Sequence, residues 1–270
     1  MRNTKPATPI WQAVCTSCRM VAGTGTTIAA LAAFGRCTTC GQPTEPKREK
    51  TARPKRHHGG LTRKKYLDPE TLLSFRKFMG DRAKERNSRR AWTDYVIVEI
   101  LARTGLRAGE LVRGEEHPNR YLRIEDVVLD ERDPAINIVE GKGNVSRVVK
   151  ISPSLRGLLA WYISEFRADA APDAALIETE WGGTALSYSS LNGAKCKLWA
   201  REYEQKVGPL GLTSLSAHVF RHSMSLVFLE KTNNNYRALA DILGHASPAI
   251  TMSVYSHTTE KQSREFADRM

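Results

Sequence analysis

The sequence predicts a mainly α-helical domain with a small antiparallel β-sheet, an α+β fold, preceded by a small cysteine-bearing module. Four of the five cysteines lie among the first 40 residues. A stretch rich in proline, lysine and arginine follows at 44–65. Beyond it, helical patterns dominate except in a β-rich segment at 121–151. We therefore predict a module at 1–43, a basic linker at 44–65 and a large domain at 66–270.

Two Cys-x-x-Cys pairs mark the amino-terminal module, Cys15 with Cys18 and Cys37 with Cys40. Eighteen residues separate the pairs, within the range of a four-cysteine zinc site. The module is too short to build an apolar core of its own. We predict a zinc-ribbon-like fold around a structural Zn²⁺, since four thiolate ligands leave no open position for water. A disulfide pair is the alternative, and nothing in the sequence indicates the oxidising compartment that it needs.

The large domain begins near Tyr66, where Asp68-Pro69-Glu70 opens a helix with an acidic first turn. Helical patterns follow around 71–78 and 92–103. The β-rich runs at 136–139 and 145–151 flank Gly141-Lys142-Gly143-Asn144, which predicts a β-hairpin with Lys142 at its tip.

Helical patterns return after Pro153. Gly244 ends one helix, and Ser247-Pro248 begins the next as N-cap and first-turn proline. The lone Cys196 lies in a helical pattern and is predicted to be a small core residue. The predicted helices span 154–167, 188–206, 217–231, 236–243 and 248–257.

Positive charge is concentrated near the amino terminus. The formal net charge is +12, and residues 1–60 hold 10 Lys and Arg against 2 Asp and Glu, whereas 61–270 hold 31 against 27. A basic arm on a nearly balanced body predicts contact with a polyanion, most commonly nucleic acid; a merely solvated tail is the alternative. No apolar run approaches the ~18 residues of a membrane span, and no secretory signal opens the chain. We expect a cytoplasmic, nucleoid-associated protein.

Candidate chemistry is spread over five short motifs. Phosphodiester exchange needs cationic multidentate donors, a nucleophile and an acid for the departing oxygen. Taken singly, each motif has a commoner explanation, such as an exposed Arg–Glu pair, a solvated helix face or a packed tyrosine. His245 follows a helix end, where the helix dipole favours the protonated imidazole. The motifs are Thr104-Gly105-Leu106-Arg107 with Glu110, Lys142, His218-x-x-Arg221-His222, Leu243-Gly244-His245, and Tyr255.

In this order, over residues 104–257, the motifs resemble the tyrosine recombinase (phage integrase) family. The stretch 239–247, together with 254–257, is especially similar. The resemblance implies that family's catalytic fold for residues 66–270. It also implies a site-specific DNA recombinase or integrase, which cleaves and rejoins DNA strands through a 3′-phosphotyrosyl intermediate.

The resemblance implies a role for each polar residue of the motifs. Arg107 and Arg221 clamp the scissile phosphate. His218 and His245 donate hydrogen bonds to it, and His218 also assists proton transfer. Glu110 supports the site without reacting.

Two further residues carry the bond exchange in this resemblance. Tyr255 attacks phosphorus, and Lys142 protonates the leaving 5′-oxygen. A tyrosine with the ordinary pKa of about 10 is a poor nucleophile until nearby cations favour its phenolate. The two arginines take the place of a metal clamp, so no cofactor is implied for catalysis.

The chain departs from the family in two places. Between Cys40 and Tyr66 there is no room for the usual helical core-binding domain, and the cysteine module with its basic linker stands there instead. A short insertion is indicated at 113–120. The resemblance implies double-stranded DNA as partner and a homotetramer on two duplexes.

Two alternative functions stay open. A type IB topoisomerase uses a similar cationic pocket and tyrosine, but the His-x-x-Arg pair and the Leu-Gly-His block favour the recombinase. A catalytically silent DNA-binding regulator is the other alternative, and the presence of all six polar positions argues against it.

Overall fold

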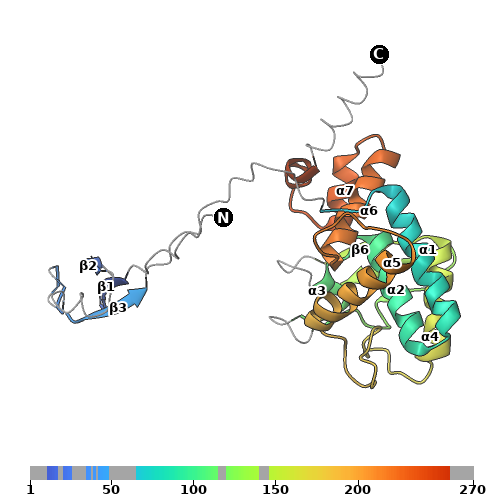
Figure 1. Ribbon diagram of the computed structural model, residues 1–270, viewed down its shortest axis with the longest axis horizontal. Coiled ribbons are helices and arrows are strands. Elements are labelled where there is room, and N and C mark those ends of the chain that lie inside the picture. The colour runs from blue at the N-terminus through green and yellow to red at the C-terminus, as the bar shows by residue number, and fades with distance from the viewer. Residues whose placement is uncertain are drawn as a thin grey trace, which may run out of the picture. The chain divides into compact units, whose positions relative to one another are not determined.

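The fold is described from a computed structural model of the 270-residue chain. The chain divides into two compact units, 1–62 and 63–270, each described here by itself. Figure 1 labels their elements. The structure describes residues 11–17, 21–25, 35–37, 39–40, 42–48, 65–114, 120–139 and 146–255.

The first unit contains a three-stranded antiparallel sheet. Its strands are β1 (Trp11–Cys15), β2 (Val21–Gly25) and β3 (Thr44–Arg48), in the order β2-β1-β3. The sequence predicts a linker from residue 44, but Thr44–Arg48 pairs along its whole length with β1. Proline and lysine are common in edge strands as well as in linkers, so composition does not separate the two. The rest of the predicted linker, 49–64, lies outside the described residues.

Two long helices begin the second unit. Helix α1 (Pro69–Arg86) starts where the Asp68 carboxylate accepts a hydrogen bond from the Thr71 N–H. Helix α2 (Arg89–Thr104) follows after the Ser88 N-cap and packs along α1. Both helices are longer than their sequence patterns predict, because caps and not periodicity set their ends.

The core of this unit is aromatic and aliphatic. Phe75 and Phe220 are fully buried, with ring centroids 5.6 Å apart. They join α1 to α6 (Ala217–Lys231), and α4 (Pro153–Phe166) packs on α2. Cys196 is fully buried, as predicted, and burial raises the pKa of its thiol to about 12.

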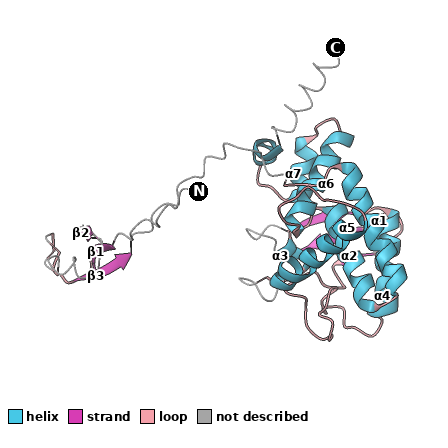
Figure 2. Ribbon diagram, viewed as in Figure 1, coloured by secondary structure: helices cyan, strands magenta, loops and turns pink. Residues whose placement is uncertain are grey.

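The predicted hairpin is confirmed as part of a small sheet. Strands β4 (Val127–Val128), β5 (Ala135–Ile138) and β6 (Arg147–Lys150) are antiparallel in the order β4-β5-β6. Figure 2 shows these strands among the helices of the unit. The hairpin tip that carries Lys142 lies outside the described residues.

The remaining helices position the candidate site. They are α3 (Ala108–Leu111), a π-helical turn over Ser190–Lys195, α5 (Cys196–Lys206), α7 (Tyr236–Leu243) and a helical segment at 248–255. Helices α6 and α7 have the predicted ends, whereas the predicted helix 188–206 contains the π-helical turn. In the part of the chain that the structure describes, no helix is both long and apolar enough to cross a membrane.

Candidate active site

Arg221 on α6 ties three segments together. Its side chain is almost fully buried, and Nη1 donates to the Gly105 carbonyl at 2.6 Å. Nη2 donates to the Leu243 carbonyl at 2.8 Å and lies 3.2 Å from His245 Nε2. Gly105 ends α2 and Leu243 ends α7, so one guanidinium meets the carboxyl ends of two helices. Carbonyl dipoles at helix ends stabilise a buried cation there.

Arg107 reaches the same region from the turn before α3. Its backbone N–H donates to Glu110 Oε2 at 2.7 Å, and its Nη1 donates to Oε1 at 3.0 Å. The Arg107 side chain keeps 28% of its surface exposed, whereas Glu110 keeps 5%. The arginine therefore presents unused donor positions to solvent, and Glu110 orients it from below the surface.

Arg147 on β6 holds Glu110 from the opposite side. Its two terminal nitrogens donate to the two carboxylate oxygens at 2.8 and 2.9 Å, and its Nε donates to the Ile242 carbonyl at 2.9 Å. The bidentate pairing couples the hairpin strand to α3 and α7. The sequence motifs do not include Arg147. Only its position shortly after the glycine-rich hairpin tip could have indicated that it belongs to the site.

The described residues of the site carry a net positive charge. Burial alone raises the Glu110 pKa, but hydrogen bonds and charge from Arg147 and Arg107 outweigh it, so the pKa lies below its ordinary value. Burial, then the charge of Arg107, lowers the Arg221 pKa to about 10. The guanidinium groups of Arg107, Arg147 and Arg221 therefore outnumber the single carboxylate of Glu110 at this site. Such a site favours an anion with several oxygens.

His245 is neutral in this arrangement. Burial, followed by the charges of Arg221 and the other two arginines, lowers its pKa to about 4. The helix dipole favours the protonated imidazole, but desolvation and nearby cations outweigh it. A guanidinium can only donate, so Nε2 accepts from Arg221, and Nδ1 donates to Thr251 Oγ1 at 2.8 Å. Donation from Nε2 to a phosphate requires the other tautomer or the imidazolium.

Tyr255 lies at the end of the helical segment 248–255 and is 5% exposed. Its hydroxyl lies 2.9 Å from His222 Nδ1 on α6. Burial raises its pKa above 10, while a hydrogen bond with Ser225 and the charge of Arg221 act in the opposite direction. The sequence leads us to expect cations to favour the phenolate, but burial has the larger effect in this arrangement.

The described part of the chain thus brings most of the predicted site together. Arg107, Arg221 and His245 are linked directly or through shared partners. His218 is connected to Tyr255 through His222, a residue to which the sequence motifs assign no role. The sixth predicted residue, Lys142, lies outside the described residues.

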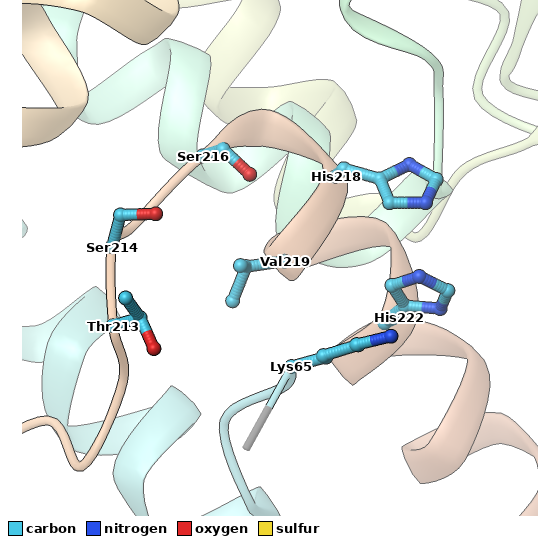
Figure 3. A pocket seen from close by; sticks show the side chains of 7 residues that line it. All are labelled: Lys65, Thr213, Ser214, Ser216, His218, Val219 and His222. Carbon is cyan, nitrogen blue, oxygen red and sulfur yellow. The ribbon is translucent and has the colours of Figure 1, made fainter. Parts of the chain in front are cut away.

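A cavity of about 310 Å³ opens beside the two histidines of α6. Burial and the neighbouring arginines lower the His218 pKa, and its ring centroid lies 4.3 Å from that of His222. Figure 3 shows both rings with the Lys65 ammonium group nearby. The cavity is lined by Lys65, Thr213, Ser214, Ser216, His218, Val219 and His222.

The backbone of the first unit brings two cysteine-bearing segments together. Cys15 ends β1 and pairs with Thr44, and the Thr44 N–H donates to the Gly35 carbonyl at 3.1 Å. Cys37, two residues after Gly35, is buried. Cys18 and the side chain of Cys15 lie outside the described residues, so the four-cysteine site stays a prediction.

A sequence model of the phage integrase family matches residues 66–262, which is more than half of the chain. The chain belongs to the phage integrase family. Tyrosine recombinase XerC of Pseudomonas aeruginosa (strain LESB58) is 29% identical over 177 residues, 65% of this chain and 51% of the relative. Tyrosine recombinase XerD of Bradyrhizobium diazoefficiens is 27% identical over 180 residues, 64% of this chain and 51% of the relative. This integrase-family chain spans about half the length of the curated relatives it matches.

Solved structures share the fold of this integrase-family chain. XerA recombinase superposes with a TM-score of 0.57 at 23% identity, covering 78% of this chain and 66% of XerA. XerH recombinase in a post-cleavage complex with palindromic difH substrate superposes with a TM-score of 0.57 at 22% identity. This match covers 71% of this chain and 49% of XerH. The prediction of a mainly helical recombinase fold with a small antiparallel sheet is confirmed.

Proposed function

We propose that this chain is a site-specific DNA recombinase that cleaves and rejoins strands through a covalent bond between Tyr255 and a 3′-phosphate. The observation that carries the proposal is the convergence of Arg107, Arg221 and His245 on one cationic site, with Tyr255 attached to the same helix as Arg221 through His222. These elements are distant in sequence, and an oxyanion with several negative oxygens is the ligand that suits them.

Arg107 and Arg221 clamp the two non-bridging oxygens of the scissile phosphate in this proposal. Their donors act most strongly as negative charge grows in the transition state. His218 adds a hydrogen bond, His245 adds another once its Nε2 carries a proton, and Lys142 protonates the leaving 5′-oxygen. The phosphotyrosyl bond retains the free energy of the phosphodiester, so rejoining needs no nucleotide cofactor.

The proposed substrate is double-stranded DNA, bound by a homotetramer on two duplexes. XerH recombinase is seen in a post-cleavage complex with its difH substrate, and the Tn1549 transposon integrase is seen with a circular intermediate DNA, which supports the substrate class. A type IB topoisomerase would form the same covalent bond. Supercoil relaxation measured beside strand exchange between two defined sites separates the two activities.

The amino-terminal unit is proposed to be a zinc ribbon that helps to hold DNA. The Thr39 N–H donates to Cys37 Sγ at 3.4 Å, a hydrogen bond that stabilises a thiolate. Cys15, Cys18, Cys37 and Cys40 would complete a tetrahedral Zn²⁺ site of structural kind. Metal analysis of the purified protein should give one zinc per chain, and chelation should unfold this unit alone. A chain without bound zinc would refute the proposal.

The test of the proposed activity is capture of the covalent adduct. The protein is mixed with a library of nicked duplexes of random sequence, and DNA that stays attached under denaturing conditions is sequenced. The native chain should form an adduct that Tyr255→Phe cannot form, although that variant should still bind DNA. Tyr162→Phe is the matched control, because it removes another buried hydroxyl, which lies 3.0 Å from Thr93 Oγ1 and is not among the residues of the candidate site. An adduct formed by Tyr255→Phe would exclude this nucleophile.

A further inference from the structure

We propose that His222 is a further catalytic residue, which holds the Tyr255 hydroxyl through Nδ1 and takes the phenolic proton as Tyr255 attacks phosphorus. The inference rests on the proposed function and assigns the proton transfer to a different residue from His218. Nδ1 lies 2.9 Å from the Tyr255 oxygen. The two ring centroids are 5.6 Å apart with an interplanar angle of 71°. The contact joins α6 to the segment 248–255.

The proposal assigns a direction to this hydrogen bond, and both groups have the protonation state that this direction needs. Burial raises the Tyr255 pKa above 10, so its oxygen carries the proton at neutral pH. Burial, then His218, Arg221 and Lys65, lowers the His222 pKa to about 4, so its ring is neutral. A protonated phenol can donate to the unprotonated nitrogen of a neutral imidazole. In the proposed arrangement His222 carries its own proton on Nε2 and accepts from the Tyr255 hydroxyl at Nδ1, 2.9 Å away.

His218 is placed for a different task. It lies one turn before His222 on α6, and no hydrogen bond joins His218 to Tyr255 among the interactions found for the described residues. Its ring stands edge-on to His222 at the cavity (Figure 3) and is exposed. This position suits donation to a phosphate oxygen, whereas His222 occupies the position against the nucleophile.

The proposed step conserves atoms and charge. A lone pair of the Tyr255 oxygen forms the bond to phosphorus, the phenolic proton passes to His222 Nδ1, and the bond from phosphorus to the 5′-oxygen breaks. The 5′-oxygen takes a proton from Lys142. In the rejoining step the attacking 5′-hydroxyl returns its proton to Lys142, and the imidazolium returns its proton to the departing tyrosine. A bound phosphate offsets the charge of Arg221 that lowers the His222 pKa, so His222 becomes a stronger base when DNA is present.

The experiment measures the rate at which the covalent adduct forms in a single turnover, with the protein in excess over a nicked duplex. His222→Asn is the informative variant, because its side-chain oxygen can replace Nδ1 as an acceptor but takes no proton at neutral pH. We expect DNA affinity to be unchanged and the rate to fall about 100-fold, the scale of general-base catalysis. The loss should narrow as the pH rises above neutral, because a growing fraction of the phenol then ionises without a base. Ser214→Ala, which alters the same cavity without touching Tyr255, should keep the native rate.

Two results would overturn the assignment. The first is native-rate cleavage by His222→Asn, because positioning alone would then be sufficient. The second needs no variant: ¹⁵N spectra of the native chain should place the His222 proton on Nε2 at pH 7, and a proton on Nδ1 contradicts the proposal. If the native chain forms no adduct with any duplex, the proposed function itself is wrong. Equal adduct formation by native chain and His222→Asn refutes only the role of His222.

Discussion

Arg147 on β6 donates hydrogen bonds to both carboxylate oxygens of Glu110, which lies 37 residues earlier in the chain. Both side chains are more than nine-tenths buried. Glu110 in turn holds the backbone and guanidinium of Arg107. Arg147 is therefore a positioning residue, which acts on the phosphate clamp through a carboxylate.

Replacing Arg147 with alanine should destabilise the large domain. Loss of one partner of a buried ion pair leaves an uncompensated charge and costs about 3–5 kcal/mol. We expect about 3 kcal/mol, at the lower end of that range, because Arg107 still contacts Glu110. Denaturant unfolding gives the value. Lys150→Ala on the same strand is the control, since its pair with Asp133 is exposed and should contribute under about 1 kcal/mol. Equal losses in the two variants would contradict the prediction.

Acid should remove the contribution of Glu110 to the stability of the folded chain. Its pKa is lowered in the folded chain, so its stabilisation is complete above the unfolded value near 4.5 and is lost as pH falls through the folded value. The difference in unfolding free energy between the native chain and Glu110→Gln should be constant from pH 5 to 7 and shrink below about pH 4.5. Unfolding curves measured across this pH range test the prediction. A free-energy difference that grows on acidification would contradict it.

Gly105→Ala should impair both stability and cleavage. Gly105 has φ +65°, and an added Cβ would lie 2.1 Å from the Met224 methyl carbon. Left-handed backbone and overpacking together should cost about 2 kcal/mol or more. The carbonyl that holds Arg221 also belongs to Gly105, so adduct formation should slow. Gly157→Ala, in open space on α4, should instead stabilise the chain by about 0.5–1 kcal/mol.

Lys142→Ala should lose the ability to cleave an ordinary duplex and should regain it on a substrate with a better leaving group. Removing a general acid typically costs a factor of about 10²–10⁴ in rate. A sulfur in place of the leaving 5′-oxygen departs without protonation, so adduct formation on that substrate should recover. The same two substrates tested with Arg107→Ala provide the comparison, because a lost phosphate clamp is not rescued by a better leaving group. Failure of rescue in Lys142→Ala would move the acid role to another residue.

The basic amino-terminal unit should make binding dependent on salt. Each phosphate contact from its lysines and arginines adds about 0.9 to the slope of log affinity against log salt concentration. A chain without residues 1–60 should bind DNA more weakly and with a flatter slope. Affinity titrations at several salt concentrations compare the two chains. Equal slopes would mean that this unit does not contact DNA.

The sequence alone determined the helices of the large domain, the hairpin and the order of the polar motifs. Those signals are local: caps, Gly244, Ser247-Pro248 and alternating β-rich runs act within a few residues, so they can be interpreted without the fold. The same locality explains one error. A strand rich in proline and lysine resembles a linker until its pairing partner is known, and for Thr44–Arg48 that partner is β1.

The tertiary structure decided which residues act on one another and in which protonation state. The contacts from Arg147 to Glu110 and from His222 to Tyr255 join elements far apart in sequence, so no local pattern predicts them. The neutral state of His245 depends on burial and on three arginines from different segments. Packing sets both distance and desolvation, and these two quantities determine the chemistry of a polar side chain.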